Sequence, residues 1–144
     1  MNKVKFAVIG CGNIGRRHIA VLDAEPQATL VAICDTNQAI CEAQSQLYNQ
    51  VPHYKDYQQL LAQVDCDFVN ICTPHHLHKA MTLEAIKQGK NVLVEKPMAL
   101  SVKDCEEMNQ AAQKAGVKLY VVKQNRFNTP VRLLKQVLDA GKLG

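Results

Sequence analysis

The chain has 144 residues, of which 47% are hydrophobic and 21% are charged, and its formal net charge at pH 7 is +4. This composition is ordinary for a globular protein with one core, so we expect a single domain over residues 1–144. The 17 Lys and Arg residues are scattered and not interleaved with aromatic residues, which argues against nucleic acid as a partner. The apolar stretch after Met1 is too short for a signal sequence or a membrane span, which predicts a cytoplasmic protein with no membrane partner.

The six cysteines form no C-x-x-C pair and no spacing typical of a disulfide framework or a zinc site. We expect them to be reduced and mostly buried. His75, His76 and His78 lie close together in sequence, but no carboxylate or cysteine completes a tetrahedral ligand set at suitable spacing. We therefore expect no metal site, and we favour a polar helix start that lines a cleft.

The first half of the chain alternates short apolar runs with amphipathic stretches, which is typical of β-α-β units. The predicted strands in this half are residues 4–9, 29–34, 51–54 and 67–72. A helix is predicted after each of the first three strands: one from about Ile14 that is closed by Pro26, one over residues 38–48 and one over residues 57–63.

The second half continues this pattern. A helix is predicted to begin after Thr73-Pro74 and to end at Gly89, because proline suits a helix start and glycine a helix end. Ser101 and Asp104 resemble a capping box for a helix that runs to Gly116. The remaining expected elements are strands over 91–94 and 117–122, and a helix over 129–141 whose apolar face carries Val131, Leu134, Val137 and Leu138.

The predicted strands are apolar throughout, as expected for parallel strands that are buried on both faces. Six such strands with intervening helices predict an α/β fold with a doubly wound parallel sheet, of the Rossmann dinucleotide-binding kind.

Gly10, Gly12 and Gly15 form a G-x-G-x-x-G pattern between the first predicted strand and its helix. Gly10 allows a tight turn, Gly12 allows the backbone to approach a pyrophosphate, and Gly15 allows close packing of the helix. The pyrophosphate is expected at the N-terminus of this helix, where free N–H groups favour anions. A glycine turn with no ligand is the alternative, but the strand before it and the acidic Asp35, which lies 20 positions after Gly15, favour dinucleotide binding.

Asp35 also discriminates between the two nicotinamide cofactors. Its carboxylate can accept hydrogen bonds from a ribose diol and would repel a 2′-phosphate, and neither Thr36 nor Asn37 offers a cation for a phosphate. We therefore predict NAD over NADP. The alternative for Asp35 is an ordinary cap for the following helix.

Glu95-Lys96-Pro97 follows the apolar run 91–94, and the ends of strands in an open α/β sheet are where ligands bind. Lys96 is therefore a candidate for acid/base work or for orienting a substrate. The alternative is a solvated loop lysine beside a turn proline.

Three segments together resemble the signatures of the Gfo/Idh/MocA oxidoreductase family. They are residues 10–15 with His18, Thr73-Pro74 with His78, and Glu95-Lys96-Pro97. The resemblance implies hydride transfer from a sugar carbon to NAD, with Lys96 as the catalytic residue that takes or orients the hydroxyl proton and with a Lys-Pro bond that is commonly cis. The cofactor site that it implies comprises Gly10, Gly12, Asn13, Ile14, Gly15, Asp35, Cys72, Thr73, Pro74, His78, Glu95, Lys96, Pro97 and Asn125.

Residues 122–128 are similar to the branch of this family that oxidises UDP-linked N-acetylglucosaminuronic acid at C3 for surface polysaccharide synthesis. Inositol, other polyols and aldoses are the alternative substrates within the family. The free-standing NAD-binding sensor or regulatory module is the alternative of another class.

The resemblance also implies a C-terminal α/β substrate domain with a catalytic histidine, and residues 141–144 resemble the junction that leads into it. We therefore expect that the substrate domain is absent from this chain, that the chain alone is inactive, and that the complete protein is a homo-oligomer.

Overall fold

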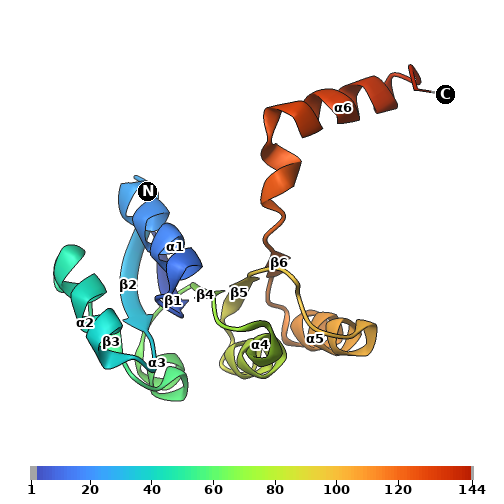
Figure 1. Ribbon diagram of the computed structural model, residues 1–144. Helices are drawn as coiled ribbons and strands as arrows, with labels where there is room; N and C mark the ends of the chain where they lie inside the picture. The colour runs from blue at the N-terminus through green and yellow to red at the C-terminus, as the bar shows by residue number, and fades with distance from the viewer. Residues whose placement is uncertain (1–2, 144) are drawn as a thin grey trace.

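The computed structural model describes residues 3–143, which form one six-stranded parallel sheet with the strand order β3-β2-β1-β4-β5-β6 (Figure 1). The strands are β1 (Val4–Ile9), β2 (Ala28–Cys34), β3 (His53–Tyr54), β4 (Phe68–Ile71), β5 (Asn91–Val94) and β6 (Leu119–Val121). This is the strand order of the dinucleotide-binding sheet. Successive strands are added on one side of β1 up to β3, and on its other side from β4 onward. The predicted doubly wound α/β fold is confirmed.

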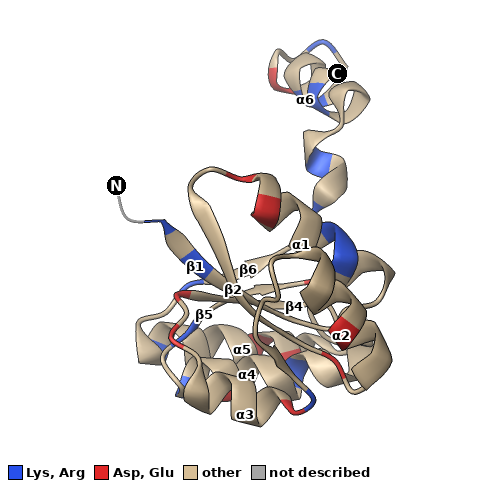
Figure 2. Ribbon diagram, turned by 90° about the vertical axis from the view of Figure 1, so that its left-hand side faces the viewer, with Lys and Arg blue, Asp and Glu red and all other residues tan. Residues whose placement is uncertain are grey.

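Helices cover the two faces of the sheet unequally. The helices are α1 (Asn13–Ala24), α2 (Gln38–Leu47), α3 (Tyr57–Gln63), α4 (His78–Lys87), α5 (Val102–Ala115) and α6 (Thr129–Asp139), with short 3₁₀ turns η1 (His75–Leu77) and η2 (Gln124–Phe127). On one face, α3, α4 and α5 form the larger core through Leu60, Met81 and Met108 (Figure 2). On the other face, α1 and α2 form a smaller core through Ile19 and Cys41.

The helix α6 lies apart from this body (Figure 1). Its sequence forms the predicted helix, but every residue of it is exposed, including the apolar Leu134 and Leu138. The apolar face of α6 is therefore not part of either core.

Several predicted boundaries differ from the structure. β3 and β6 are shorter than predicted, and α4 is preceded by η1 instead of beginning directly after Pro74. Ser101 caps α5 by accepting a hydrogen bond from the N–H of Asp104, as predicted. The reciprocal arm of a capping box is missing, because the Asp104 carboxylate accepts hydrogen bonds from the Ser101 hydroxyl and from Lys79 instead. Among the described helices, none is both long and apolar enough to cross a membrane.

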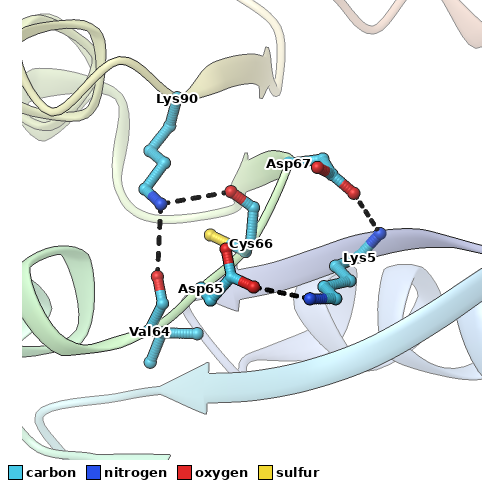
Figure 3. A network of polar contacts seen from close by, with 6 residues as sticks. All are labelled: Lys5, Val64, Asp65, Cys66, Asp67 and Lys90. Atoms are coloured by element: carbon cyan, nitrogen blue, oxygen red, sulfur yellow. Dashed lines mark hydrogen bonds and ion pairs between the residues drawn. The ribbon is translucent and has the colours of Figure 1, made fainter.

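A polar network joins the amino-terminal ends of the strands (Figure 3). The N–H of Lys5 donates to the Asp67 carboxylate at 2.8 Å, and its ammonium pairs with Asp65 at 2.5 Å. Lys90 donates to two backbone carbonyl oxygens ahead of β4, each at 3.2 Å. These contacts hold β1, β4 and the start of β5 in register at the amino-terminal edge of the sheet. Ligands bind in this fold at the opposite edge, at the carboxyl ends of the strands.

Candidate functional site

Two glycines of the turn between β1 and α1 are required by the fold itself. Gly10 has a φ of +96°, and a Cβ atom there would lie 2.7 Å from the carbonyl oxygen of Cys72. A Cβ atom on Gly15 would lie 1.7 Å from the carbonyl oxygen of Gly10. A Cβ atom on Gly12, in contrast, would meet nothing within 4 Å, so packing within the described chain does not require a glycine there.

The N-terminus of α1 carries no side-chain cap, and Gly12 is its N-cap residue. The Asn13 side chain accepts a hydrogen bond from Arg16 at 2.5 Å instead of capping the helix. The first backbone N–H groups of a helix have no partner within it, and the helix dipole adds positive potential at this end. The open space beside Gly12 therefore lies at a point of the fold that is suited to an anion.

Asp35 follows β2, and both of its oxygens accept backbone hydrogen bonds. Oδ2 accepts from the N–H of Cys11 at 2.7 Å, and Oδ1 accepts from the N–H of Asn37 at 2.8 Å. The cap of α2 is Asn37, whose side chain accepts from the N–H of Ile40. The alternative reading of Asp35 as that cap is therefore wrong. Each carboxylate oxygen retains a further lone pair for a ligand.

The carboxyl ends of β1, β2 and β4 open into a cavity of about 940 Å³. A cavity of this size lies within the range typical of small-molecule and cofactor sites. Six of the predicted site residues line it: Gly10, Gly12, Asp35, Cys72, Thr73 and Pro74.

Several residues that line the same cavity were not predicted from the sequence: Ile9, Cys34, Thr36, Lys55, Asp56, Tyr57, Gln59, Leu77 and Met81. Lys55, Asp56 and Tyr57 come from the connection between β3 and the start of α3. They reach the cavity because β3 pairs with β2 and ends on the same edge of the sheet. Their position directly after the third predicted strand could have identified them as residues of the site.

Thiol chemistry is not expected in this cavity. Burial raises the pKa of the Cys72 thiol, and the nearby Glu95 raises it further. Burial likewise raises the pKa of Cys34 to about 12. The thiolate is the reactive form of cysteine, so these side chains act as small apolar groups near neutral pH. All six cysteines are free and every one but Cys105 is buried, as predicted.

His78 lies beneath the cavity, not on its surface. It is fully buried, and its ring nitrogens Nδ1 and Nε2 lie 2.8 Å and 2.9 Å from the carbonyl oxygens of Pro97 and Thr73. The expectation that the histidine segment lines a cleft is wrong for His78, because this side chain instead ties the end of β4 to the end of β5. Within residues 3–143, no three His, Cys, Asp or Glu side chains are grouped so that they could hold a metal ion.

The Glu95-Lys96-Pro97 segment follows β5, and its peptide bond between Lys96 and Pro97 is cis, as the resemblance implied. Glu95 is only 6% exposed; its Oε1 lies 2.9 Å from His18 Nε2, and its Oε2 accepts from the N–H of Lys96 at 3.2 Å. The Lys96 side chain is exposed and makes no ion pair within the described residues. The Glu95 carboxylate is therefore bound to His18 and does not pair with the neighbouring ammonium.

The remaining predicted site residues lie outside the cavity lining. Asn13 and Ile14 are exposed in the first turn of α1, and Gly15 is buried within it. Asn125 is exposed in η2 and accepts a hydrogen bond from Asn128 at 3.2 Å. The structure brings the glycine turn, Asp35 and the Thr73-Pro74 turn together around one cavity, and it does not bring Asn125 to it.

Residues 4–123 match the family model described as "Oxidoreductase family, NAD-binding Rossmann fold", GFO_IDH_MocA. The WlbA dehydrogenase of Chromobacterium violaceum, solved with NADH and UDP-GlcNAcA, is 36% identical with a TM-score of 0.96, and the match covers 100% of this chain and 42% of that one. The WlbA dehydrogenase of Bordetella pertussis, solved with the same ligands, is 36% identical with a TM-score of 0.94, and the match covers 99% of this chain and 44% of that one.

Among curated relatives, D-glucoside 3-dehydrogenase of Escherichia coli is 30% identical over 142 residues, which cover 98% of this chain and 40% of the relative. The chain thus spans about two fifths of the length of the relatives that it matches. The family match extends over most of the chain and includes the glycine turn, Asp35 and the end of β5. The chain therefore belongs to the Gfo/Idh/MocA family of oxidoreductases, and it is an NAD-binding Rossmann domain.

Proposed function

We propose that this chain is the cofactor-binding part of an NAD-dependent dehydrogenase that oxidises a CH–OH group of a nucleotide sugar. The observation that carries the proposal is the cavity at the carboxyl ends of β1, β2 and β4, with the exposed Lys96 at the end of the adjacent strand β5. This is the place at which open α/β sheets bind their ligands, where the order of the strands reverses.

The residues present fit NAD. The space beside Gly12 and the uncapped N-terminus of α1 suit the pyrophosphate, which the N–H groups of Asn13, Ile14 and Gly15 would bind. Asp35 would accept hydrogen bonds from the ribose hydroxyls.

Further residues would complete the cofactor site. Cys72, Thr73 and Pro74 would form the wall along the cofactor, since they line the same cavity. His78 and Pro97 would support that wall from beneath through the carbonyl contacts of His78. A role for Asn125 rests on the family resemblance alone.

Lys96 is the residue of this chain that we assign to the chemistry. Bound NAD supplies the acceptor for the hydride. Lys96 would orient the substrate hydroxyl with its ammonium, or receive the hydroxyl proton on a neutral amine. Glu95 contacts His18 and the backbone N–H of Lys96, and the Lys96 ammonium makes no ion pair within the described residues. Lys96 therefore remains available to a hydroxyl group.

We propose UDP-N-acetylglucosaminuronate as the substrate, with oxidation at C3. The two structures solved with UDP-GlcNAcA are 36% identical to this chain, whereas the inositol dehydrogenase structures of Lactobacillus plantarum and Lactobacillus casei are 26% and 25% identical. The similarity of residues 122–128 to the branch of the family that oxidises this nucleotide sugar supports the same substrate. A polyol or glycoside is the second candidate, because inositol and glucoside dehydrogenases are 28% and 30% identical to this chain.

The test is NADH production by a protein that contains residues 1–144 together with the substrate domain implied by the resemblance. We expect turnover with UDP-N-acetylglucosaminuronate well above that with myo-inositol, and a loss of at least about 100-fold in kcat for Lys96→Met. The control is Lys87→Met, which removes a lysine that is exposed on α4. Unchanged turnover in Lys96→Met would refute the assigned role, and NADH binding with no turnover of any sugar would favour the sensor alternative.

A further inference from the structure

His18 belongs to one of the three family-like segments, yet neither the cavity nor the proposed chemistry accounts for it. It lies on α1, one turn beyond the glycine turn, and its side chain is 12% exposed. Its ring nitrogens bridge two other elements of the fold. Nδ1 lies 3.0 Å from Nδ2 of Asn70 on β4, and Nε2 lies 2.9 Å from Oε1 of Glu95 at the end of β5.

The donors and acceptors along this chain of contacts are mutually consistent. The Asn70 amide donates to Nδ1 of His18, so the ring proton lies on Nε2 and is donated to the Glu95 carboxylate. The other carboxylate oxygen accepts the backbone N–H of Lys96 at 3.2 Å. Four residues from three different elements thus form one continuous hydrogen-bonded path that ends at the Lys96 backbone.

Asn70 fixes the direction of this path. Its Oδ1 is buried and has no hydrogen-bond partner within the described residues. With the amide turned over, the unpartnered position would hold an NH₂ group. Unpaired buried carbonyl oxygens are tolerated better than unpaired N–H groups. The observed orientation is therefore the favoured one, and it selects the His18 tautomer that donates to Glu95.

We propose that His18 is a positioning residue for Lys96, which acts through Glu95. It holds the Glu95 carboxylate in the orientation that fixes the Lys96 backbone, and it thereby joins the helix of the glycine turn to the end of β5. The inference rests on the proposed role of Lys96 in the chemistry. Its test needs neither substrate nor cofactor, so its failure is distinguishable from a failure of the proposed function.

Two substitutions of His18 separate its two hydrogen bonds. In His18→Gln the side-chain amide reaches as far as Nε2 and can still donate to Glu95, whereas in His18→Asn the amide reaches only as far as Nδ1. The readout is the hydrogen-exchange rate of the Lys96 amide in this chain, followed by NMR. We expect exchange about tenfold or more faster in His18→Asn than in the unmodified chain, and within about threefold of it in His18→Gln.

The amide of Glu95 is the internal control, because it donates to the carbonyl oxygen of Ile71 at 3.0 Å and does not depend on His18. Equal Lys96 exchange in both His18 variants, or equal acceleration of the Glu95 amide, would overturn the proposal in favour of a packing role. If His18→Asn does not fold, Glu95→Gln serves instead, because its single oxygen cannot accept both hydrogen bonds. Unchanged Lys96 exchange in Glu95→Gln would also contradict the proposal.

The ¹⁵N signals of the His18 ring give a second readout. We expect the ring proton on Nε2 and none on Nδ1 in the unmodified chain. A proton on Nδ1 alone in the unmodified chain would contradict the assigned path.

Discussion

Gly12 and Gly15 lie in the same turn, but the structure gives them different tasks. A Cβ atom on Gly15 would collide with the backbone of Gly10, which no side-chain movement can relieve, whereas one on Gly12 meets open space. We expect Gly15→Ala to lower the free energy of unfolding by at least about 2 kcal/mol. Gly12→Ala should lower it by about 1 kcal/mol or less, the range for an N-cap position.

The same pair should differ in ligand binding. If the space beside Gly12 receives the pyrophosphate, a methyl group there should weaken NADH binding by about tenfold or more while the fold persists. Urea unfolding and an NADH titration of each variant measure the two effects. Tight NADH binding by a folded Gly12→Ala variant would contradict the assignment of this space to the cofactor.

At the residue scale, the sequence identified several residues of the site but not the contacts that their side chains make. The glycine pattern, Asp35 and the Thr73-Pro74 turn could be assigned to one site because strand ends share an edge of the sheet. The partners of His78 and Glu95 could not be predicted. They are carbonyl and ring atoms from elements that only the folded sheet brings together, 19 and 77 residues away in the case of Pro97 and His18.

A cluster of charges links α4 to α5. Lys79 bonds Asp104 at 2.5 Å and Glu107 at 2.6 Å. The hydrogen bond from Lys79, followed by that from Ser101, lowers the pKa of Asp104 below its ordinary value of 3.8. Since the folded state binds this proton more weakly than the unfolded state, the contribution of the pair to stability is present above about pH 4 and is lost as the pH falls further.

Replacing Lys79 tests this dependence on pH. We expect Lys79→Met to lose less stability than the unmodified chain between pH 7 and about pH 3, because the proton-linked contribution is already absent. The urea midpoint at the two pH values measures it. Lys87→Met is the matched control, since Lys87 lies 3.8 Å from Glu84 on the exposed side of the same helix. An identical pH response in the Lys79 and Lys87 variants would argue against the account.

At the level of elements, prediction succeeded where hydrophobic period and caps agreed. The helix α3 has the predicted bounds, since the Asp56 side chain caps its start. The edge strands β3 and β6 are shorter than predicted, because the apolar run alone does not show how far a neighbouring strand continues to pair with it. The lone position of α6 was also not predictable, because its apolar face is a normal signal of a packed helix.

The whole molecule therefore has a packed body and one helix outside it. Leu60 on α3 is fully buried, whereas Leu134 on α6 is 58% exposed. We expect Leu60→Ala to lower the free energy of unfolding by about 2–5 kcal/mol, since it removes buried methyl groups and leaves a cavity. Leu134→Ala should change it by no more than about 0.5 kcal/mol. Urea unfolding of the two variants measures the difference, and equal losses would mean that α6 packs against the body.

The central claim is that the cavity at the strand ends binds NAD, with Asp35 selecting against a 2′-phosphate. The most direct measurement is a fluorescence titration of this chain with NADH and, in parallel, with NADPH. The account predicts saturable binding of NADH at one site and binding of NADPH that is weaker by about tenfold or more. No saturable NADH binding, or NADPH binding as tight as that of NADH, would contradict it.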